Sequence, residues 1–204
     1  MSEYVMPTRP PQEGWDLHCH TVFSDGTRTP REMVQEAKSL GLHGVAIADH
    51  DTTAGWEEAG QASHDLHLPL MRGTEITAQD GNVSVHMLAY LYDPRNRHIC
   101  DLFEKTRRSR VERTKKMVAL LAKDYPISWQ SVLEQTKEGS RTTIGRPHIA
   151  DALVAAGVYA NRNEAFADAV STHSKYYIPT PSPSTSEVVR AVEGAGGVSV
   201  IAHA

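Results

Sequence analysis

The chain has 204 residues, of which 40% are hydrophobic and 23% are charged, and its formal net charge is −4. This composition indicates a globular protein of one domain, or of one domain with an inserted subdomain. The acidic balance argues against general, sequence-blind binding of nucleic acid, although it leaves room for a local basic groove.

The two cysteines, Cys19 and Cys100, provide neither a disulfide framework nor a Cys-x-x-Cys site, as is usual in a reducing cytosol. No apolar run is long enough to span a membrane. Residues 1–14 are polar and rich in proline, which is typical of a disordered leader rather than a signal peptide. We therefore expect a cytoplasmic protein with no membrane partner.

The first predicted strand, at 15–21, has Asp16, His18 and His20 at alternate positions. Alternate side chains of a strand point to the same face, so these three are expected to lie together while Leu17 and Cys19 face the packing. Two neutral imidazoles on one face can bind a single metal ion. A lone His-x-His pair is more often simply solvated, so the rest of the chain must decide.

Strand and helix signals alternate up to residue 97, which is the pattern of an α/β fold. Thr29-Pro30-Arg31-Glu32 is a capping box with proline at the first helical position, and Gly41 ends the helix. Asp80-Gly81 predicts a tight hairpin turn. The other elements expected in this part are a strand at 45–48, a helix at 56–66, a strand at 70–75 that ends on Glu75, and a strand at 83–90.

The signals are helical from residue 98 to residue 185. A segment of this length is too long for a simple connection, so we expect a helical insertion subdomain. An apolar strand returns before His203. The chain is thus divided into a leader at 1–14, a first α/β part at 15–97, the insertion at 98–185 and a continued α/β part at 186–204.

Residues that commonly bind metals stand at the ends of four predicted strands. They are His18 with His20, His50, Glu75 and His203. In α/β barrels and open α/β sheets the carboxyl ends of parallel strands surround the active site. Four independent placements of this kind are a much stronger signal than any one of these residues alone.

With these residues assembled, the chain resembles the polymerase and histidinol phosphatase (PHP) superfamily of metal-dependent phosphoesterases. The matching segments are Asp16–Thr21, Ser24–Gly26, Ala48–Asp51, Gly73–Glu75 and Ile201–His203. The resemblance extends to Gly145–Ala150, which is similar to the phosphate-contacting segment of the branch that hydrolyses nucleotides and short RNA. It implies a distorted seven-stranded (β/α) barrel with a site for two or three divalent metal ions.

The same resemblance implies the metal ligands. The first metal is expected on His18 and His20, with Glu75 as the bridge to a second metal on His86 and His203, and a third metal on Asp25 and His50. Such mixed imidazole and carboxylate sets suit manganese, zinc or iron rather than calcium. Asp16 and Asp49 are expected to support the ligand imidazoles through hydrogen bonds.

The implied reaction is hydrolysis of a phosphate ester by attack of a metal-bound hydroxide. Arg146 is expected to neutralise charge on the phosphate, because its planar fork suits phosphate oxygens, and His148 to orient the phosphate or protonate the leaving oxygen. The expected partner is a phosphorylated small molecule, a nucleotide (a nucleoside 5′-phosphate or a 3′,5′-bisphosphate) or the 5′ end of a short single-stranded RNA. Without the metal-type residues, Arg146 would simply be an exposed residue at a helix start.

Three other interpretations stay open. The protein could be a histidinol-phosphate-type phosphatase, a non-catalytic PHP-like scaffold, or a metal amidohydrolase, a class that also opens with His-x-His but favours a carboxylated lysine where Glu75 stands. The carboxyl-terminal strands and the last metal motif of the family have no counterpart before Ala204. We therefore expect the closing strands to come from elsewhere, and the activity of this segment alone is in question.

A run of seven basic residues follows at the start of the predicted insertion. Its members are Lys105, Arg107, Arg108, Arg110, Arg113, Lys115 and Lys116. At 100° per residue they spread around a helix, so we interpret them as a solvated face, with contact to a nucleic-acid backbone as the alternative.

Overall fold

The computed structural model describes residues 14–203, so the predicted leader falls almost wholly outside the described residues. The strands are β1 Trp15–Cys19, β2 Gly44–Ile47, β3 Leu70–Asp80, β4 Val83–Tyr90 and β5 Val198–Ala202. The helices are α1 Pro30–Ser39, α2 Trp56–Leu66, α3 Arg97–Leu121, α4 Trp129–Leu133, α5 Arg146–Ala155, α6 Arg162–Ala167 and α7 Thr185–Gly194, with a 3₁₀ turn at Gly139–Arg141. None of these helices is long and apolar enough to cross a membrane.

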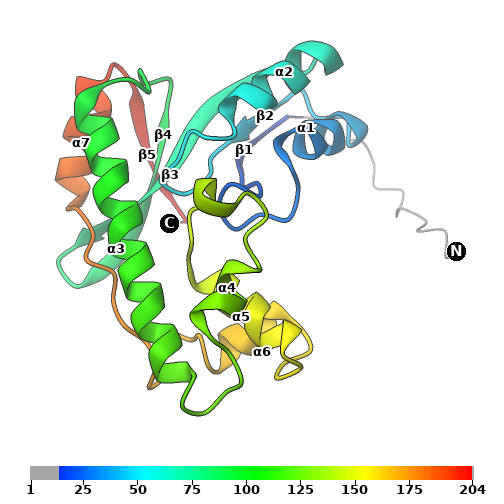
Figure 1. Cartoon of the computed structure of the whole chain (residues 1–204). Coiled ribbons are helices and arrows are strands. Elements are labelled where there is room, and N and C mark those ends of the chain that lie inside the picture. The colour runs from blue at the N-terminus through cyan, green and yellow to red at the C-terminus, as the bar shows by residue number, and fades with distance from the viewer. Residues whose placement is uncertain (1–13, 204) are drawn as a thin grey trace, which may run out of the picture.

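The strands form one curled, half-barrel sheet in the order β1-β2-β3-β4-β5 (Figure 1). β1, β2 and β3 are parallel, and β4 is antiparallel to both of its neighbours. The α/β class expected from the sequence is confirmed. Five strands of the expected seven are present among the described residues.

The third strand differs from its predicted extent, because β3 continues five residues beyond Glu75 to Asp80. β2 ends at Ile47, but β3 continues as the antiparallel partner of β4, from the Gly73–Tyr90 pair to the Asp80–Val83 pair. Gly81 takes a positive φ of 55° in the hairpin turn, as the Asp-Gly pair predicts. Glu75 therefore lies in the middle of a strand and not at its end.

The two faces of the sheet have different characters. Ile76 and Ala78 point into the main hydrophobic core, which α1, α2, α7 and the first part of α3 cover. Glu75 and Thr77 alternate with them and therefore point to the opposite face. On that face the apolar side chains form only a small cluster, which includes Ala46 and Leu88. The polar side chains Glu75 and Thr77 lie on the same face.

The predicted helical segment packs around a second hydrophobic cluster. The later part of α3 supplies Met117 and Leu121, which meet Ile149 and Leu153 of α5. Figure 1 shows α3 running from beside the sheet to the group formed by α4, α5 and α6. α3 thus contributes to both hydrophobic clusters and passes the polar face of the sheet between them.

The start of α1 is fixed by the predicted capping box. The Thr29 hydroxyl accepts a hydrogen bond from the Glu32 backbone N–H at 3.2 Å, and the Glu32 carboxylate accepts one from the Thr29 N–H at 2.8 Å. These bonds satisfy two of the donors that a helix start leaves free.

Replacing Thr29 by alanine should therefore lower the free energy of unfolding by about 1 kcal/mol, because one cap donor loses its partner. Urea unfolding followed by circular dichroism measures this change. Thr27→Ala is the matched control, since Thr27 is exposed and lies outside the cap. Equal stability of the two variants would contradict the assignment.

Candidate metal centre

A single buried carboxylate, that of Glu75, lies at the centre of the imidazole cluster and is 1% exposed. Its Oε2 atom is 3.2 Å from His18 Nε2, 3.0 Å from His20 Nε2 and 3.3 Å from His50 Nδ1. Burial alone would raise the pKa of Glu75, but hydrogen bonds from His20 and His86 and the nearby imidazoles hold it far below its usual range. The group is therefore an anion at any physiological pH.

The other oxygen of the same carboxylate is turned toward β4 and β5, on the same face of the sheet. Glu75 Oε1 is 2.7 Å from His86 Nδ1 and 3.1 Å from His203 Nε2. His86 lies on β4 and pairs with Ala202, so the strand register brings His203 beside it. Glu75 thus stands between two pairs of imidazoles, with one oxygen turned to each pair.

The geometry on the Oε2 side fits a metal ion. His18 Nε2 and His20 Nε2 are 3.1 Å apart, so with Glu75 Oε2 they form a triangle with sides of 3.0 to 3.2 Å. Atoms bound to one tetrahedral zinc ion at roughly 2.0 Å lie about 3.3 Å from one another. A triangle of two imidazole nitrogens and a carboxylate oxygen is therefore close to the spacing that one ion requires.

Two further triplets of possible ligand atoms share members with the first. They are His20 with Asp25 and His50, and His50 with Glu75 and His86, and in each triplet the atoms lie within 4.8 Å of one another. Asp25 Oδ1 is 3.4 Å from His20 Nδ1, and Oδ2 is 3.7 Å from His50 Nε2. The structure therefore brings all seven expected ligands into one continuous cluster.

The first strand reaches the cluster through an irregular stretch. The pairing of β1 with β2 shifts register between Asp16 and Cys19. The side chains of β1 therefore do not simply alternate between the two faces of the sheet. Cys19 packs against the main core, as expected, but Leu17 is 44% exposed. The expectation that Leu17 faces the packing is wrong, because the register shift between Asp16 and Cys19 breaks the alternation of side chains on which it depended.

The loop after β1 is held by Asp49, which is 1% exposed. Its carboxylate accepts hydrogen bonds of 2.6 Å from the Thr21 N–H, the Thr21 hydroxyl and the Ser24 hydroxyl. Ser24 Oγ in turn lies 3.2 Å from His20 Nδ1. Burial raises the pKa of Asp49, and these hydrogen bonds partly offset the rise. Asp49 thus acts on an imidazole through Ser24 and not by direct contact.

Asp16 has a different position. It is exposed and accepts a hydrogen bond from the His18 backbone N–H at 3.1 Å, so its contact is with the main chain and not with a ring. The two carboxylates expected to support the ligands therefore differ, because Asp49 is built into the loop and Asp16 lies at the surface.

Arg146 and His148 lie at the start of α5. Arg146 lines a cavity of about 190 Å³ together with Asp25, His50 and His86. His148 is 3% exposed, and its Nδ1 accepts a hydrogen bond from the Gly145 N–H at 3.2 Å. The proton of a neutral His148 is then on Nε2. Burial lowers the pKa of His148, which keeps the ring neutral.

Sequence reasoning missed two arginines of this cavity. Arg110 and Arg113 of α3 also line it, and they are only 9% and 8% exposed. The interpretation of the basic run as a solvated face is therefore wrong for these two residues. Their spacing from Met117 and Leu121 places them on the buried stripe of the helix. This spacing is the feature of the sequence that could have identified them as buried.

Arg110 connects α3 to the cluster. Its Nη2 lies 3.1 Å from His50 Nδ1 and also donates a hydrogen bond to the Thr77 hydroxyl, while its Nε is 2.8 Å from Asp51 Oδ2. Asp51 is fully buried, and burial raises its pKa to about 6 although Arg110 opposes the rise.

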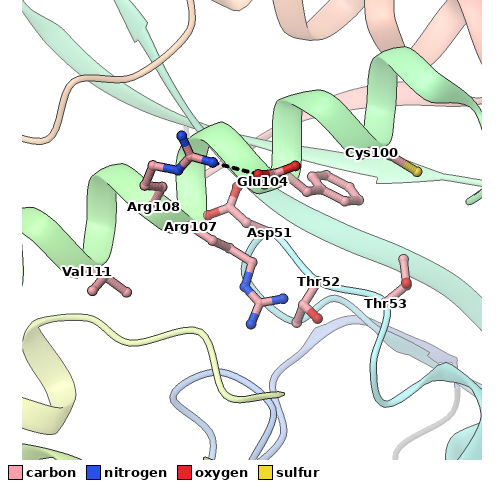
Figure 2. Close-up of a pocket in the computed structure, with 9 residues that line it drawn as sticks. Asp51, Thr52, Thr53, Cys100, Glu104, Arg107, Arg108 and Val111 are labelled. Atoms are coloured by element: carbon pink, nitrogen blue, oxygen red, sulfur yellow. Dashed lines mark hydrogen bonds and ion pairs between the residues drawn. The ribbon is translucent and has the colours of Figure 1, made fainter. Parts of the chain in front are cut away.

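A second, larger cavity of about 560 Å³ contains none of the cluster imidazoles. Figure 2 shows Asp51, Thr52 and Thr53 on one side of it and side chains of α3, which include Cys100 and Arg107, on the other. Asp51 is the residue next to His50, but this cavity offers no set of metal ligands. We therefore place the site at the smaller cavity, which is lined by Asp25, His50 and His86 of the cluster and by the arginines.

Comparison with known proteins gives consistent results. A family model described as PHP domain matches residues 16–183. A 5′-3′ exoribonuclease of Haemophilus influenzae is 26% identical over 93% of this chain and 68% of its own length. A 3′,5′-nucleoside bisphosphate phosphatase of Chromobacterium violaceum is 29% identical over 92% of this chain and 66% of its own length.

Solved structures agree with this result. A Bifidobacterium adolescentis protein described as a metal-dependent phosphoesterase is 69% identical, with a TM-score of 0.93 over 96% of this chain and 68% of that one. An amidohydrolase of Chromobacterium violaceum is 29% identical, with a TM-score of 0.84 over 93% of this chain and 66% of that one. The chain thus spans about two thirds of the length of these relatives.

Asp49→Ala should weaken metal binding about 10- to 100-fold, because Ser24 and the loop that carries His20 and Asp25 lose their anchor. Titration with Mn²⁺ or Zn²⁺ against a chromophoric chelator measures the affinity, and a thermal melt confirms that the variant is folded. Asp16→Ala is the matched control and should bind metal almost as well as the unchanged protein. A larger loss for Asp16→Ala than for Asp49→Ala would contradict this distinction.

Metal affinity should also fall on acidification. Burial alone would lower the pKa of His20, but Glu75 and Asp25 raise it above its ordinary value of 6.5. A ligand imidazole must be neutral, so below this raised pKa a proton competes with the metal and the apparent Kd increases by about tenfold per pH unit for each proton displaced. Titrations between about pH 8 and about pH 5.5 test this, and an affinity independent of pH would refute it.

Proposed function

This chain belongs to the PHP domain family and is a hydrolase of phosphoester bonds, and on that premise we propose that its substrate is a phosphate ester of a nucleotide or short oligonucleotide. The substrate would be a nucleoside 5′-phosphate, a 3′,5′-bisphosphate or the 5′ end of an RNA. The observation that carries the proposal is one cavity in which three members of the cluster, Asp25, His50 and His86, lie with three arginines.

The residues present fit divalent metals. We propose two or three ions of manganese, zinc or iron, held by His18, His20, Asp25, His50, Glu75, His86 and His203. Imidazole with carboxylate is the donor set that these metals prefer. A buried carboxylate shared between two pairs of imidazoles suits a bridging ligand.

Bound metals would supply a water of lowered pKa and would neutralise charge on the phosphate. The protein contributes the remaining groups. Arg146 binds a phosphate oxygen of the substrate through its planar fork. His148, which is buried and neutral with its proton on Nε2, donates a hydrogen bond to the substrate from beside Pro147 of the cavity lining. Arg110 fixes His50 and Thr77 relative to each other and adds positive charge.

Specific observations weigh against the alternatives. A non-catalytic scaffold has no need for seven ligand residues with their nitrogens and oxygens turned toward one another. A substrate of the histidinol phosphate type carries one phosphate, whereas three arginines line this cavity. An amidohydrolase relative exists among the solved structures, but Glu75 stands at the strand position where the metal amidohydrolase interpretation favours a carboxylated lysine.

We also propose that the complete barrel has seven strands. The two edge strands carry exposed apolar side chains, which include Trp15 and Leu17 on β1 and Val200 and Ile201 on β5. Uncovered apolar edges of this kind favour pairing with further strands. The same proposal includes the division of the chain. The barrel parts are 15–97 and 186–204, and the helical insertion between them is 98–185.

Glu75→Gln should abolish metal binding and phosphoester hydrolysis together, because the amide loses the charge that balances the imidazoles. The measurements are metal content by inductively coupled plasma mass spectrometry and phosphate release from a panel of nucleotides and 5′-phosphorylated RNA. Glu104→Gln is the matched control, since Glu104 is exposed and pairs with Arg108 on α3. Full turnover by Glu75→Gln would rule out the proposed site.

A further inference from the structure

The loop that carries Asp25 has no helix or strand of its own, and residues far along the chain hold its main chain. Four carbonyl groups between residues 22 and 27 each accept a hydrogen bond from the chain between residues 137 and 162. The pairs are Thr142 Oγ1 with Val22 at 3.1 Å, Thr143 N–H with Phe23 at 2.8 Å, Arg162 Nη1 with Asp25 at 2.9 Å and Lys137 Nζ with Thr27 at 2.8 Å. The helical segment is therefore part of what fixes this loop.

The carboxylate of Asp25 depends on its main chain for its position. The one hydrogen bond that another described residue donates to it, from the Ser24 hydroxyl, is long at 3.4 Å. Its oxygens lie 3.4 Å from His20 Nδ1 and 3.7 Å from His50 Nε2. Ligand distances at a metal ion vary by only roughly 0.2 Å, so a small shift of the Asp25 main chain would be enough to weaken binding.

Arg162 differs from the other donors because its guanidinium group makes three directed contacts. Its Nε and Nη2 atoms donate to the two oxygens of Asp151, both at 2.5 Å, while Nη1 donates to the Asp25 carbonyl. Bidentate pairing with a carboxylate fixes the plane of a guanidinium group. The remaining N–H is then directed at the Asp25 carbonyl. Lys137, by contrast, is exposed and has one ammonium group on a flexible stem.

The partner of Arg162 belongs to the helix that also carries the residues expected to contact phosphate. α5 begins with Arg146 and His148, and Asp151 follows His148 by three positions, so these two side chains are neighbours on the helix surface. Arg162 is the first residue of α6. α5 thus presents His148 near the cavity and, one turn later, holds the arginine that reaches the Asp25 loop.

We propose that Arg162 is a positioning residue, which is held by Asp151 and fixes the Asp25 carbonyl, and thereby places the Asp25 carboxylate for a metal ion shared with His50. This inference rests on the proposed function, in which these residues bind one of two or three ions, and deepens it. Occupation of this position then depends on the contact between the helical segment and the loop. Glu75 and His86 lie within β3 and β4, so the ions that they bind should not depend on Arg162.

Arg162→Lys tests the assignment, because lysine keeps the charge opposite Asp151 but lacks the fork that also reaches the Asp25 carbonyl. Titration of the metal-free protein with Mn²⁺, with free Mn²⁺ measured by electron paramagnetic resonance, gives the number and affinity of the bound ions. One equivalent should bind about tenfold more weakly in Arg162→Lys, and the others should be unchanged. Arg108→Lys is the matched control, since Arg108 pairs with Glu104 on the outer face of α3, and it should bind all ions normally.

Hydrogen exchange of the metal-free protein gives a readout that needs neither metal nor substrate. Peptides that cover residues 21–28 should exchange faster in Arg162→Lys than in the unchanged protein, while peptides of β3 should exchange at the same rate. Asp151→Asn should have the same effect on the loop. The variant with both substitutions should lose no more Mn²⁺ affinity than the more affected single variant, because both changes act on one contact.

Unchanged exchange of the loop in a folded Arg162→Lys protein would overturn the inference. An equal loss of affinity for every bound ion would overturn it as well, because Arg162 would then support the whole fold and not Asp25. Additive losses in the variant with both substitutions would contradict the role of Asp151. Failure of the unchanged protein to bind Mn²⁺ would instead count against the proposed function, and the exchange of the loop would then decide whether Arg162 positions Asp25.

Discussion

The buried negative charge of Glu75 is the constraint on which the rest of the structure depends. A carboxylate that is 1% exposed must be matched by positive groups or by metal, because an isolated charge in the interior is very costly. β3 is the middle strand, so Glu75 can receive His18 and His20 from one side and His86 and His203 from the other. A ligand on an edge strand would have neighbours on one side only.

This central position also links the sheet to the helical segment. Thr77 follows Glu75 on the same face, and Arg110 of α3 contacts both Thr77 and His50. Asp51 then neutralises Arg110 from the loop after β2. α3 is therefore attached to the site by a buried ionic contact as well as by its apolar stripe. Movement of α3 relative to the sheet would disturb His50, which lies in two of the three ligand triplets.

The sequence predicted those parts of the structure whose signals are local. The capping box at Thr29, the helix at 56–66 and the hairpin turn at Asp80-Gly81 are all confirmed, because each is determined by residues a few positions apart. The cluster of imidazoles and carboxylates was recognisable because strand ends meet in an α/β fold and the motifs resemble a known family. The extension of β3 was missed, since it depends on pairing with β4 rather than on its own composition.

The buried arginines show why the remaining part of the site could not be predicted. A charged residue on the apolar stripe of α3 is explained only by partners distant in the sequence, and Asp51 is such a partner for Arg110. The same structure reconciles the acidic net charge with an anionic substrate. On the outer face of α3, Arg108 pairs with Glu104 and Lys115 with Glu112, so those charges are already balanced. Among the described residues, the positive charge without a carboxylate partner, on Arg113 and Arg146, lies instead at the wall of a small cavity beside Asp25 and His50.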